Sequence, residues 1–283
     1  MTLIMKGSEV SAGMKTRILD ELQTLSITPT LAVIRVGSRP DDLAYERGII
    51  KRFDSLGLNV KVHEFHENIS QNDFDSEFMN INNNPNIHGI LLFRPLPNGL
   101  SDEFAVRNIN PMKDVDCMSD VNIAGVFAGK RECFAPCTAS AVMEMLSHYE
   151  INLQGMNVAV LGRSMVIGRP VAMMMMKQNA TVTICHTKTH DIKDICRRSD
   201  IIVAAAGKAL MLTRDYVNEN SIIVDVGINV DANGKLCGDV DFVNVSSVVK
   251  AISPVPGGVG AVTTSVLAEH VVRAAKFKEG TAQ

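Results

Sequence analysis

Short apolar runs alternate along this chain with segments in which apolar residues recur at helical spacing. In the second half, such runs predict buried strands at 158–161, 180–185, 201–207 and 222–229. In the first half they predict three further strands, at 30–36, 60–65 and 87–93. Because strands that alternate with helices are typical of parallel sheets, the pattern indicates an α/β fold with a doubly wound sheet.

Helical spacing of apolar residues predicts five longer helices, near 8–25, 41–57, 70–79, 138–149 and from 262 onward. The length of 283 residues suits two domains, since a domain typically holds ~100–200 residues. We expect an α/β domain over residues 1–138 and a nucleotide-binding domain over residues 139–261. The last helix, 262–278, should pack back on the first domain and complete it.

Composition narrows the range of partners. The net charge is −3, so a role in binding nucleic acid or a membrane surface has little electrostatic support. No apolar stretch reaches the ~18 residues that a membrane helix needs. Six cysteines occur without a Cys-x-x-Cys pair, which favours reduced thiols in a cytoplasm and predicts no metal site.

The turn from Gly162 to Gly168 follows a predicted strand and leads into a helix. A sharp strand-to-helix turn leaves backbone N–H groups free at the helix start, where they bind anionic phosphate. Ser164 stands where the common Gly-x-Gly-x-x-Gly pattern has its middle glycine. The turn therefore predicts a nucleotide site, and the alternative is an ordinary strand-to-helix turn.

The end of the next strand indicates which nucleotide would bind. An NAD site usually offers an Asp or Glu there to the ribose hydroxyls, but this chain has His-Thr-Lys-Thr at 186–189. Arg163 and Lys188 would suit a ribose 2′-phosphate instead. We therefore expect NADP rather than NAD, unless these residues are simply solvated loop positions.

Several motifs together resemble one family, the methylenetetrahydrofolate dehydrogenase/cyclohydrolases known as FolD proteins. The matching stretches are Pro-Met-Lys-Asp-Val-Asp at 111–116, Pro-Cys-Thr at 136–138, Gly-Arg-Ser at 162–164 through Pro170, Asp-Val-Gly-Ile-Asn at 225–229 and Pro-Val-Pro-Gly-Gly-Val-Gly at 254–260. The similarity runs from about Leu31 to Glu269. It implies a catalytic α/β domain, a Rossmann-type NADP-binding domain, a cleft between them and a homodimer.

The resemblance also implies site residues. Cofactor contacts would come from Gly162, Arg163, Ser164, Gly168, Thr187 and Ile228. The folate would meet Tyr45, Asp116, Gly257 and Gly258, with Tyr45 and Asp116 as the catalytic candidates. Two alternatives stay open: Asp116 as a carboxylate that caps a loop, because Asp is a favoured turn residue, and Tyr45 as a plain surface aromatic.

The chain departs from the family pattern at four positions. Isoleucine at 49 stands where the family has a catalytic lysine, and Phe93 stands where it has the glutamine that orients this lysine. Cys117 replaces a glycine and Ala261 replaces a proline.

The first two departures affect two reactions differently. Hydride transfer from 5,10-methylenetetrahydrofolate to NADP needs alignment of two ligands and no proton transfer to a side chain. Hydrolysis of the methenyl product gains roughly 10²–10⁴-fold from an acid/base group. We therefore expect a dehydrogenase with weak or absent cyclohydrolase activity. The alternatives are a complete bifunctional enzyme, with Arg94, Arg52 or a water chain replacing the lysine, and a non-catalytic NADP- or folate-binding relative.

Overall fold

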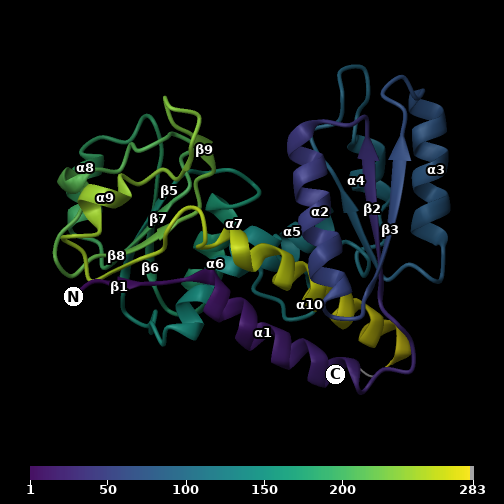
Figure 1. Ribbon diagram of the computed structural model, residues 1–283, viewed down its shortest axis with the longest axis horizontal. Coiled ribbons are helices and arrows are strands. Elements are labelled where there is room, and N and C mark those ends of the chain that lie inside the picture. Colours follow the sequence, from purple (N-terminus) through teal and green to yellow (C-terminus); the bar gives the residue numbers. More distant parts are fainter. Residues whose placement is uncertain (281–283) are drawn as a thin grey trace. The chain divides into compact units, whose positions relative to one another are not determined.

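The computed structural model describes residues 1–280 and separates into two units (Figure 1). The six-stranded unit comprises residues 1–13 and 138–263. The three-stranded unit comprises residues 14–137 and the segment from Thr264 onward. Helices α1 (Gly7–Leu22) and α10 (Gly260–Glu279) each contribute residues to both units.

All strands of the larger sheet run parallel, in the order β1-β11-β8-β7-β5-β6. They are β1 (Leu3–Ile4), β5 (Asn157–Leu161), β6 (Thr181–Cys185), β7 (Ile201–Ala204), β8 (Ile222–Asp225) and β11 (Ala251–Ile252). Residues of β7 and β8 are buried throughout, as expected for a parallel sheet covered on both faces. The predicted doubly wound α/β fold is confirmed.

Helices and short segments complete the six-stranded unit. They are α6 (Cys137–His148), α7 (Gly168–Lys177), α8 (Ile192–Arg197), α9 (Phe242–Val245), the 3₁₀ turn η1 (Arg214–Tyr216) and the hairpin of β9 (Asn229–Val230) with β10 (Leu236–Cys237). Apolar side chains from the strands, α8 and α9 form one buried core.

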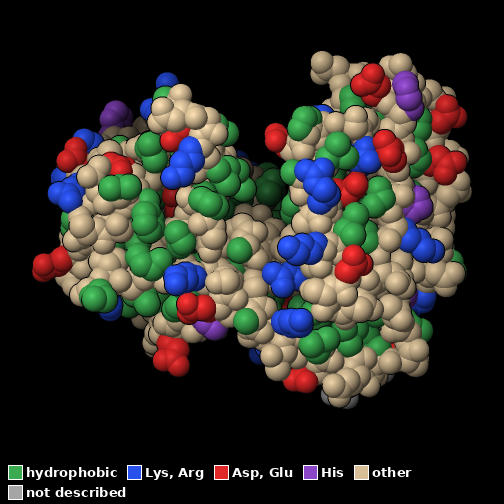
Figure 2. Space-filling view, in the orientation of Figure 1, with side chains coloured by type: hydrophobic (Ala, Val, Ile, Leu, Met, Phe, Trp, Pro, Cys, Tyr) green, Lys and Arg blue, Asp and Glu red, His purple; other side chains and the backbone are tan. Residues whose placement is uncertain are grey.

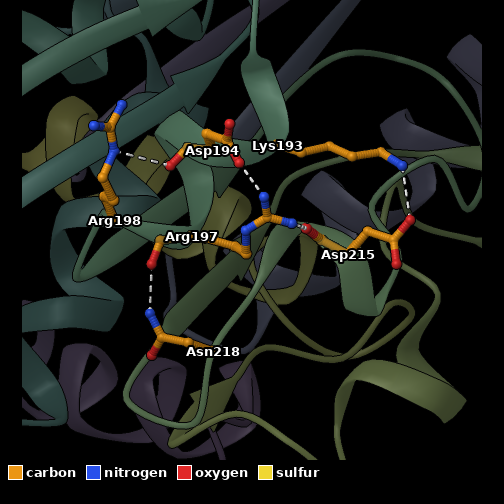
Figure 3. A network of polar contacts seen from close by, with 6 residues as sticks. All are labelled: Lys193, Asp194, Arg197, Arg198, Asp215 and Asn218. Atoms are coloured by element: carbon orange, nitrogen blue, oxygen red, sulfur yellow. Dashed lines mark hydrogen bonds and ion pairs between the residues drawn. The ribbon is translucent and has the colours of Figure 1, made fainter.

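A polar network joins α8 to η1 at the surface (Figure 3). Lys193 Nζ lies 2.7 Å from Asp215 Oδ2, and Arg197 Nη1 donates to the Asp215 carbonyl at 2.9 Å. Asn218 Nδ2 donates to the Arg197 carbonyl at 2.5 Å. Because these charged side chains are exposed, the network contributes little stability.

The three-stranded unit is built on a smaller parallel sheet, in the order β3-β2-β4. Its strands are β2 (Thr30–Val36), β3 (Asn59–Phe65) and β4 (Gly89–Leu92), and its helices are α2 (Pro40–Asp54), α3 (Gln71–Asn83), α4 (Glu103–Asn108) and α5 (Asp120–Phe127). Figure 1 shows α2 and α3 on opposite sides of the sheet. Phe74 and Phe78 of α3 pack with Ile34 and Ile90 of the strands in one core.

One part of the expected division differs. We expected residues 1–13 in the N-terminal domain, but they belong to the six-stranded unit. Leu3 N–H donates to the Lys250 carbonyl and Met5 N–H to the Ile252 carbonyl, both at 2.9 Å, so β1 is an edge strand beside β11. Neither two-residue strand is long enough to show an alternating pattern in the sequence.

The described residues include no helix that is long and apolar enough to cross a membrane. All six cysteines are free. On the face shown in Figure 2, acidic and basic side chains are interspersed on each unit, which agrees with the small net charge.

A buried ion pair holds α2 against the smaller sheet. Arg35 of β2 is almost fully buried, and its Nε donates to Glu46 Oε2 of α2 at 2.9 Å. Its Nη2 lies 3.1 Å from Glu64 Oε2 on β3. Hydrogen bonds to Glu64 and Glu46 raise the pKa of Arg35, against the opposing effect of burial. The pair therefore positions the helix turn that carries Tyr45.

Removing one partner of this pair should destabilise the protein strongly. An Arg35→Met variant leaves the Glu46 carboxylate buried and uncompensated, at an expected cost of about 3–5 kcal/mol in the free energy of unfolding. Arg39→Met, which breaks the exposed Arg39–Asp42 pair, should cost at most about 1 kcal/mol. Chemical denaturation of both variants tests this, and equal costs would contradict it.

Candidate active site

The turn between β5 and α7 requires glycine at two positions. Gly162 has a φ of +129°, and a Cβ atom there would collide with the backbone carbonyl of Ala205. A Cβ on Gly168 would collide with the carbonyl of Gly162. The turn is thus packed backbone against backbone, which leaves its outer side open to a ligand.

The loops that follow four strands lie along one edge of the larger sheet. Leu161 pairs with Cys185 and Ala204, and Ala204 pairs with Asp225. The register therefore places Gly162 and the loop that contains Thr187 beside one another. Parallel α/β sheets bind ligands at this edge, where the strand order changes direction.

The side chains on this edge fit a phosphate-bearing ligand. Arg163, Ser164, Thr187 and Lys188 are exposed, and Ser164 Oγ accepts from the Ile167 N–H at 3.1 Å. Within residues 1–280, neither Arg163 nor Lys188 forms an ion pair. Two cationic side chains are thus available to an anion, and no carboxylate stands at 186–189.

Two buried carboxylates organise the neighbouring loops. Asp225 Oδ1 accepts from the N–H groups of Gly227 and Asp239 at 2.9 and 3.0 Å, and its Oδ2 accepts from Val240 N–H at 3.0 Å. Asp239 is fully buried and accepts from three successive N–H groups, at 206–208, and from Asn229 Nδ2. These bonds hold the loops after β7 and β8 at the candidate cofactor edge.

A cavity of about 280 Å³ in the six-stranded unit brings predicted cofactor and substrate residues together. Ile228, from the predicted cofactor set, lines it with Gly257 and Gly258 of the glycine-rich loop. Gly257 has a φ of +98° and its carbonyl accepts from Gly7 N–H at 2.8 Å. A Cβ on Gly258 would collide with the Pro254 carbonyl. The loop therefore folds back so tightly that only glycine fits at this position.

Tyr45 lies in the three-stranded unit and packs on Phe93. Their ring centroids are 5.6 Å apart, with 29° between the ring planes. Burial raises the pKa of Tyr45 well above its usual value, and the nearby Asp116 and Cys137 add to this shift. Ile49, one helical turn after Tyr45, is fully buried. The positions at which the family has lysine and glutamine are therefore occupied by core-packed apolar side chains.

The Pro-Met-Lys-Asp-Val-Asp loop contains two carboxylates with different surroundings. Asp114 is fully buried and accepts from Met118 N–H, Ser119 N–H, Ser119 Oγ and Asn122 Nδ2 at 2.6–2.9 Å. Asp116 is only half-buried, and Cys137 N–H donates to its Oδ1 at 2.8 Å. Asp114 therefore caps the loop, whereas Asp116 keeps acceptor capacity for a ligand.

Burial raises the pKa of Asp116, while hydrogen bonds from Cys137 oppose that shift and the nearby Asp114 adds to it. The charge of Arg94 also lowers this pKa. Arg94 is itself paired with Asp102 at 3.2 Å and is partly exposed.

The residue after Asp116 has a backbone conformation that suits the glycine of the family pattern. Cys117 has a φ of +60°, a left-handed conformation that glycine adopts without strain and other residues adopt at a cost of ~1–2 kcal/mol. The family's glycine suits this backbone, and the cysteine keeps it with strain, beside a candidate ligand-binding carboxylate.

Within the described part of the chain, no group of three or more His, Cys, Asp or Glu side chains is arranged to hold a metal ion. The parallel sheet, the glycine turn and the open edge define an α/β protein of the dinucleotide-binding class.

Comparison with known families identifies the family. Residues 5–116 match the catalytic domain of tetrahydrofolate dehydrogenase/cyclohydrolase, and residues 136–279 match the NAD(P)-binding domain of the same family. The chain therefore belongs to the tetrahydrofolate dehydrogenase/cyclohydrolase family.

Relatives are similar over nearly the whole length. The bifunctional protein FolD of Clostridium botulinum (strain Okra / Type B1) is 49% identical over 279 residues, which cover 98% of this chain and 99% of the relative. The crystal structure of bifunctional FolD from Campylobacter jejuni is 37% identical with a TM-score of 0.94, covering 98% of this chain and 99% of that one. The Trypanosoma brucei dehydrogenase-cyclohydrolase, complexed with NADP and an inhibitor, is 33% identical with a TM-score of 0.91, covering 98% of each chain.

A methyl group on Gly168 should damage the turn. Because its Cβ would meet the Gly162 carbonyl and the Arg163 nitrogen, we expect Gly168→Ala to weaken NADP binding by at least about tenfold, the equivalent of one lost charge-assisted hydrogen bond. Gly48→Ala, at a helical position with no atom nearby, is the control and should bind NADP normally. Calorimetric titration of both variants measures the effect, and unchanged affinity in Gly168→Ala would refute this role of the turn.

Asp225 should make stability depend on pH in a defined direction. Burial raises its pKa from 3.8 to about 6, so the folded chain binds the extra proton between those values. The stabilising contribution is complete below about pH 4 and is lost as the pH rises through about 6. The free energy of unfolding of the wild type minus that of Asp225→Asn should therefore fall by on the order of 3 kcal/mol between about pH 4 and pH 7. Denaturation at several pH values measures this difference, and a constant difference would contradict the shift.

Proposed function

We propose that this chain oxidises 5,10-methylenetetrahydrofolate to 5,10-methenyltetrahydrofolate with NADP as the hydride acceptor. The observation that carries the proposal is that each unit holds one candidate ligand site. The six-stranded unit has a glycine turn flanked by cations that form no ion pair within residues 1–280, and the three-stranded unit has a carboxylate with spare acceptor capacity near Tyr45, which stacks on Phe93. The reaction moves one hydride, with its two electrons, from the methylene bridge to the nicotinamide of the bound cofactor. The folate nitrogen lone pairs stabilise the resulting cation.

The cofactor preference is argued from the edge of the larger sheet. Gly162 and Gly168 would let the pyrophosphate approach the backbone, and Arg163 and Lys188 would pair with the 2′-phosphate. Thr187 and Ser164 offer hydroxyl groups at the same edge, and Ile228 offers an apolar surface. The related Trypanosoma brucei enzyme was crystallised with NADP, which supports the same preference here.

The folate end is argued from the three-stranded unit. Asp116 would accept hydrogen bonds from the amino group and ring N–H of the pterin, and the Tyr45 ring would form an apolar wall. Gly257 and Gly258 would contact the substrate from the glycine-rich loop. In this step the side chains bind, orient and exclude water, because no proton has to move.

Hydrolysis of the methenyl product is the second candidate activity. The related proteins from Clostridium botulinum and Campylobacter jejuni are named bifunctional, and this favours a complete enzyme over our expectation of weak or absent cyclohydrolase activity. Because Ile49 and Phe93 carry no titratable group, hydrolysis in this chain has to use other residues. Arg94 is the candidate whose charge reaches Asp116. A guanidinium is a fixed positive charge and not a base, so its role would be to favour hydroxide over water as the nucleophile, with the proton released to solvent.

Both half-reactions on one preparation test the proposal. We expect NADPH to form on addition of 5,10-methylenetetrahydrofolate and NADP, and NADH to form more slowly with NAD. Methenyl-folate should disappear faster than in buffer alone. Arg94→Ala should slow that hydrolysis by at least about tenfold and leave NADPH formation intact, in line with the usual contribution of one positioned group.

Two results would change the assignment. Cofactor binding without NADPH formation would make the chain a non-catalytic relative. Hydrolysis at the buffer rate would make it a dehydrogenase alone. The homodimer implied by the family resemblance stays a prediction.

A further inference from the structure

The backbone carbonyl of Val115, the residue before Asp116, is held from a distant part of the chain. His270 of α10 lies 155 residues further along, and its Nδ1 is 2.8 Å from this carbonyl oxygen. A carbonyl oxygen only accepts, so Nδ1 carries the proton and donates. The thiol of Cys137 donates to the same oxygen at 3.3 Å. One carbonyl beside the candidate site thus has two side-chain donors.

The imidazole of His270 is fixed in place by its neighbours. The residue is almost fully buried, and its ring centroid lies 5.3 Å from that of Phe134. The guanidinium of Arg273 covers Phe134, with its carbon 4.3 Å from the ring centroid. Burial, helped by the charge of Arg273, lowers the pKa of His270 to about 3. It is therefore a neutral donor at physiological pH.

The loop around Asp116 needs such support. Cys137 N–H contacts the Asp116 carboxylate directly at 2.8 Å, and Asp114 anchors the following residues, Met118 and Ser119. Between these anchors, Cys117 adopts its strained left-handed conformation. The peptide plane between Val115 and Asp116 sets the direction in which the Asp116 side chain leaves the backbone, so a bond to the Val115 carbonyl constrains that direction.

We propose that His270 is a positioning residue for substrate binding: its Nδ1–H holds the Val115 carbonyl and thereby aims the Asp116 carboxylate at the pterin ring. The inference rests on the proposed function, in which Asp116 binds the folate. His270 does not touch the substrate. This role requires an N–H donor at the δ position of the side chain. A side chain that only filled the core would not need such a donor.

Three substitutions test this requirement. His270→Leu removes the closer donor and leaves the Val115 carbonyl with only the 3.3 Å contact of the Cys137 thiol. The KM for 5,10-methylenetetrahydrofolate should therefore rise about tenfold, as expected for the loss of one buried hydrogen bond. His270→Asn places an N–H at the δ position and should return the KM to within about threefold of wild type. His270→Gln places its N–H one bond further and should behave like His270→Leu. The NADP dissociation constant and kcat should stay within about twofold in all three, because the bond acts on folate binding alone.

A second buried histidine provides the matched control. His88 of the same unit is equally buried, and its Nδ1 accepts from Thr30 N–H at 3.1 Å. His88→Leu should lower the melting temperature and leave the folate KM unchanged. If His270→Leu does not fold, the comparison of His270→Asn with His270→Gln decides, since equal KM values in these two variants overturn the inference.

Asp116→Ala separates this inference from the proposed function. If wild type reduces NADP and Asp116→Ala loses folate affinity while His270→Leu keeps it, the inference about His270 is wrong and the proposed function stands. If Asp116→Ala binds the folate as wild type does, the role proposed for Asp116 is wrong, and with it the basis for the inference.

Discussion

Buried carboxylates that accept backbone N–H groups are the interaction on which both units depend. Asp225 and Asp239 hold the loops after β7 and β8, and Asp114 holds the loop that contains Asp116. Loops of this kind carry many polar backbone groups and few apolar contacts, so an internal acceptor is the simplest way to fix them. A carboxylate oxygen can satisfy two donors at once, and therefore one side chain can tie together several residues that lie far apart in sequence.

This arrangement separates a structural acid from a candidate ligand-binding acid, although the two look alike in the sequence. Asp114 and Asp116 are two residues apart and both belong to the family motif. Four donors engage Asp114, whereas in the described part of the chain the Asp116 carboxylate accepts from one residue, Cys137. The first therefore stabilises the loop, and the second keeps the capacity to bind a donor from outside the chain. In the six-stranded unit, Asp225 and Asp239 likewise accept hydrogen bonds from the chain itself. Arg163 has no ion-pair partner in the described part of the chain, and it therefore remains available to a ligand.

Much of the fold could be predicted from the sequence because several strands contain short uninterrupted apolar runs. Strands β5, β7 and β8 are buried almost completely, and each contains at least three consecutive apolar residues. The edge strand β1 and its neighbour β11 hold only two residues each, which is too short for any periodic signal. The membership of residues 1–13 was therefore missed.

Prediction of the site was limited by long-range contacts. Local motifs and family resemblance supplied the glycine turn, Tyr45 and Asp116 as candidates, and their roles stay predictions. Asp239 follows a glycine, and nothing in the sequence shows that it accepts four hydrogen bonds. His270 lies in a helix whose pattern indicates packing alone, and its contact with Val115 exists only because the fold joins distant segments.

The thiol of Cys137 has a consequence for the chemical durability of this protein. It lies at the start of α6, and the N–H of the same residue donates to Asp116. Burial and the adjacent carboxyl raise the pKa of this thiol well above its usual value, so almost none of it is ionised in neutral solution. Peroxide and alkylating reagents attack the ionised form, and this sulfur is therefore inert toward oxidants that disable enzymes with exposed, acidic cysteines.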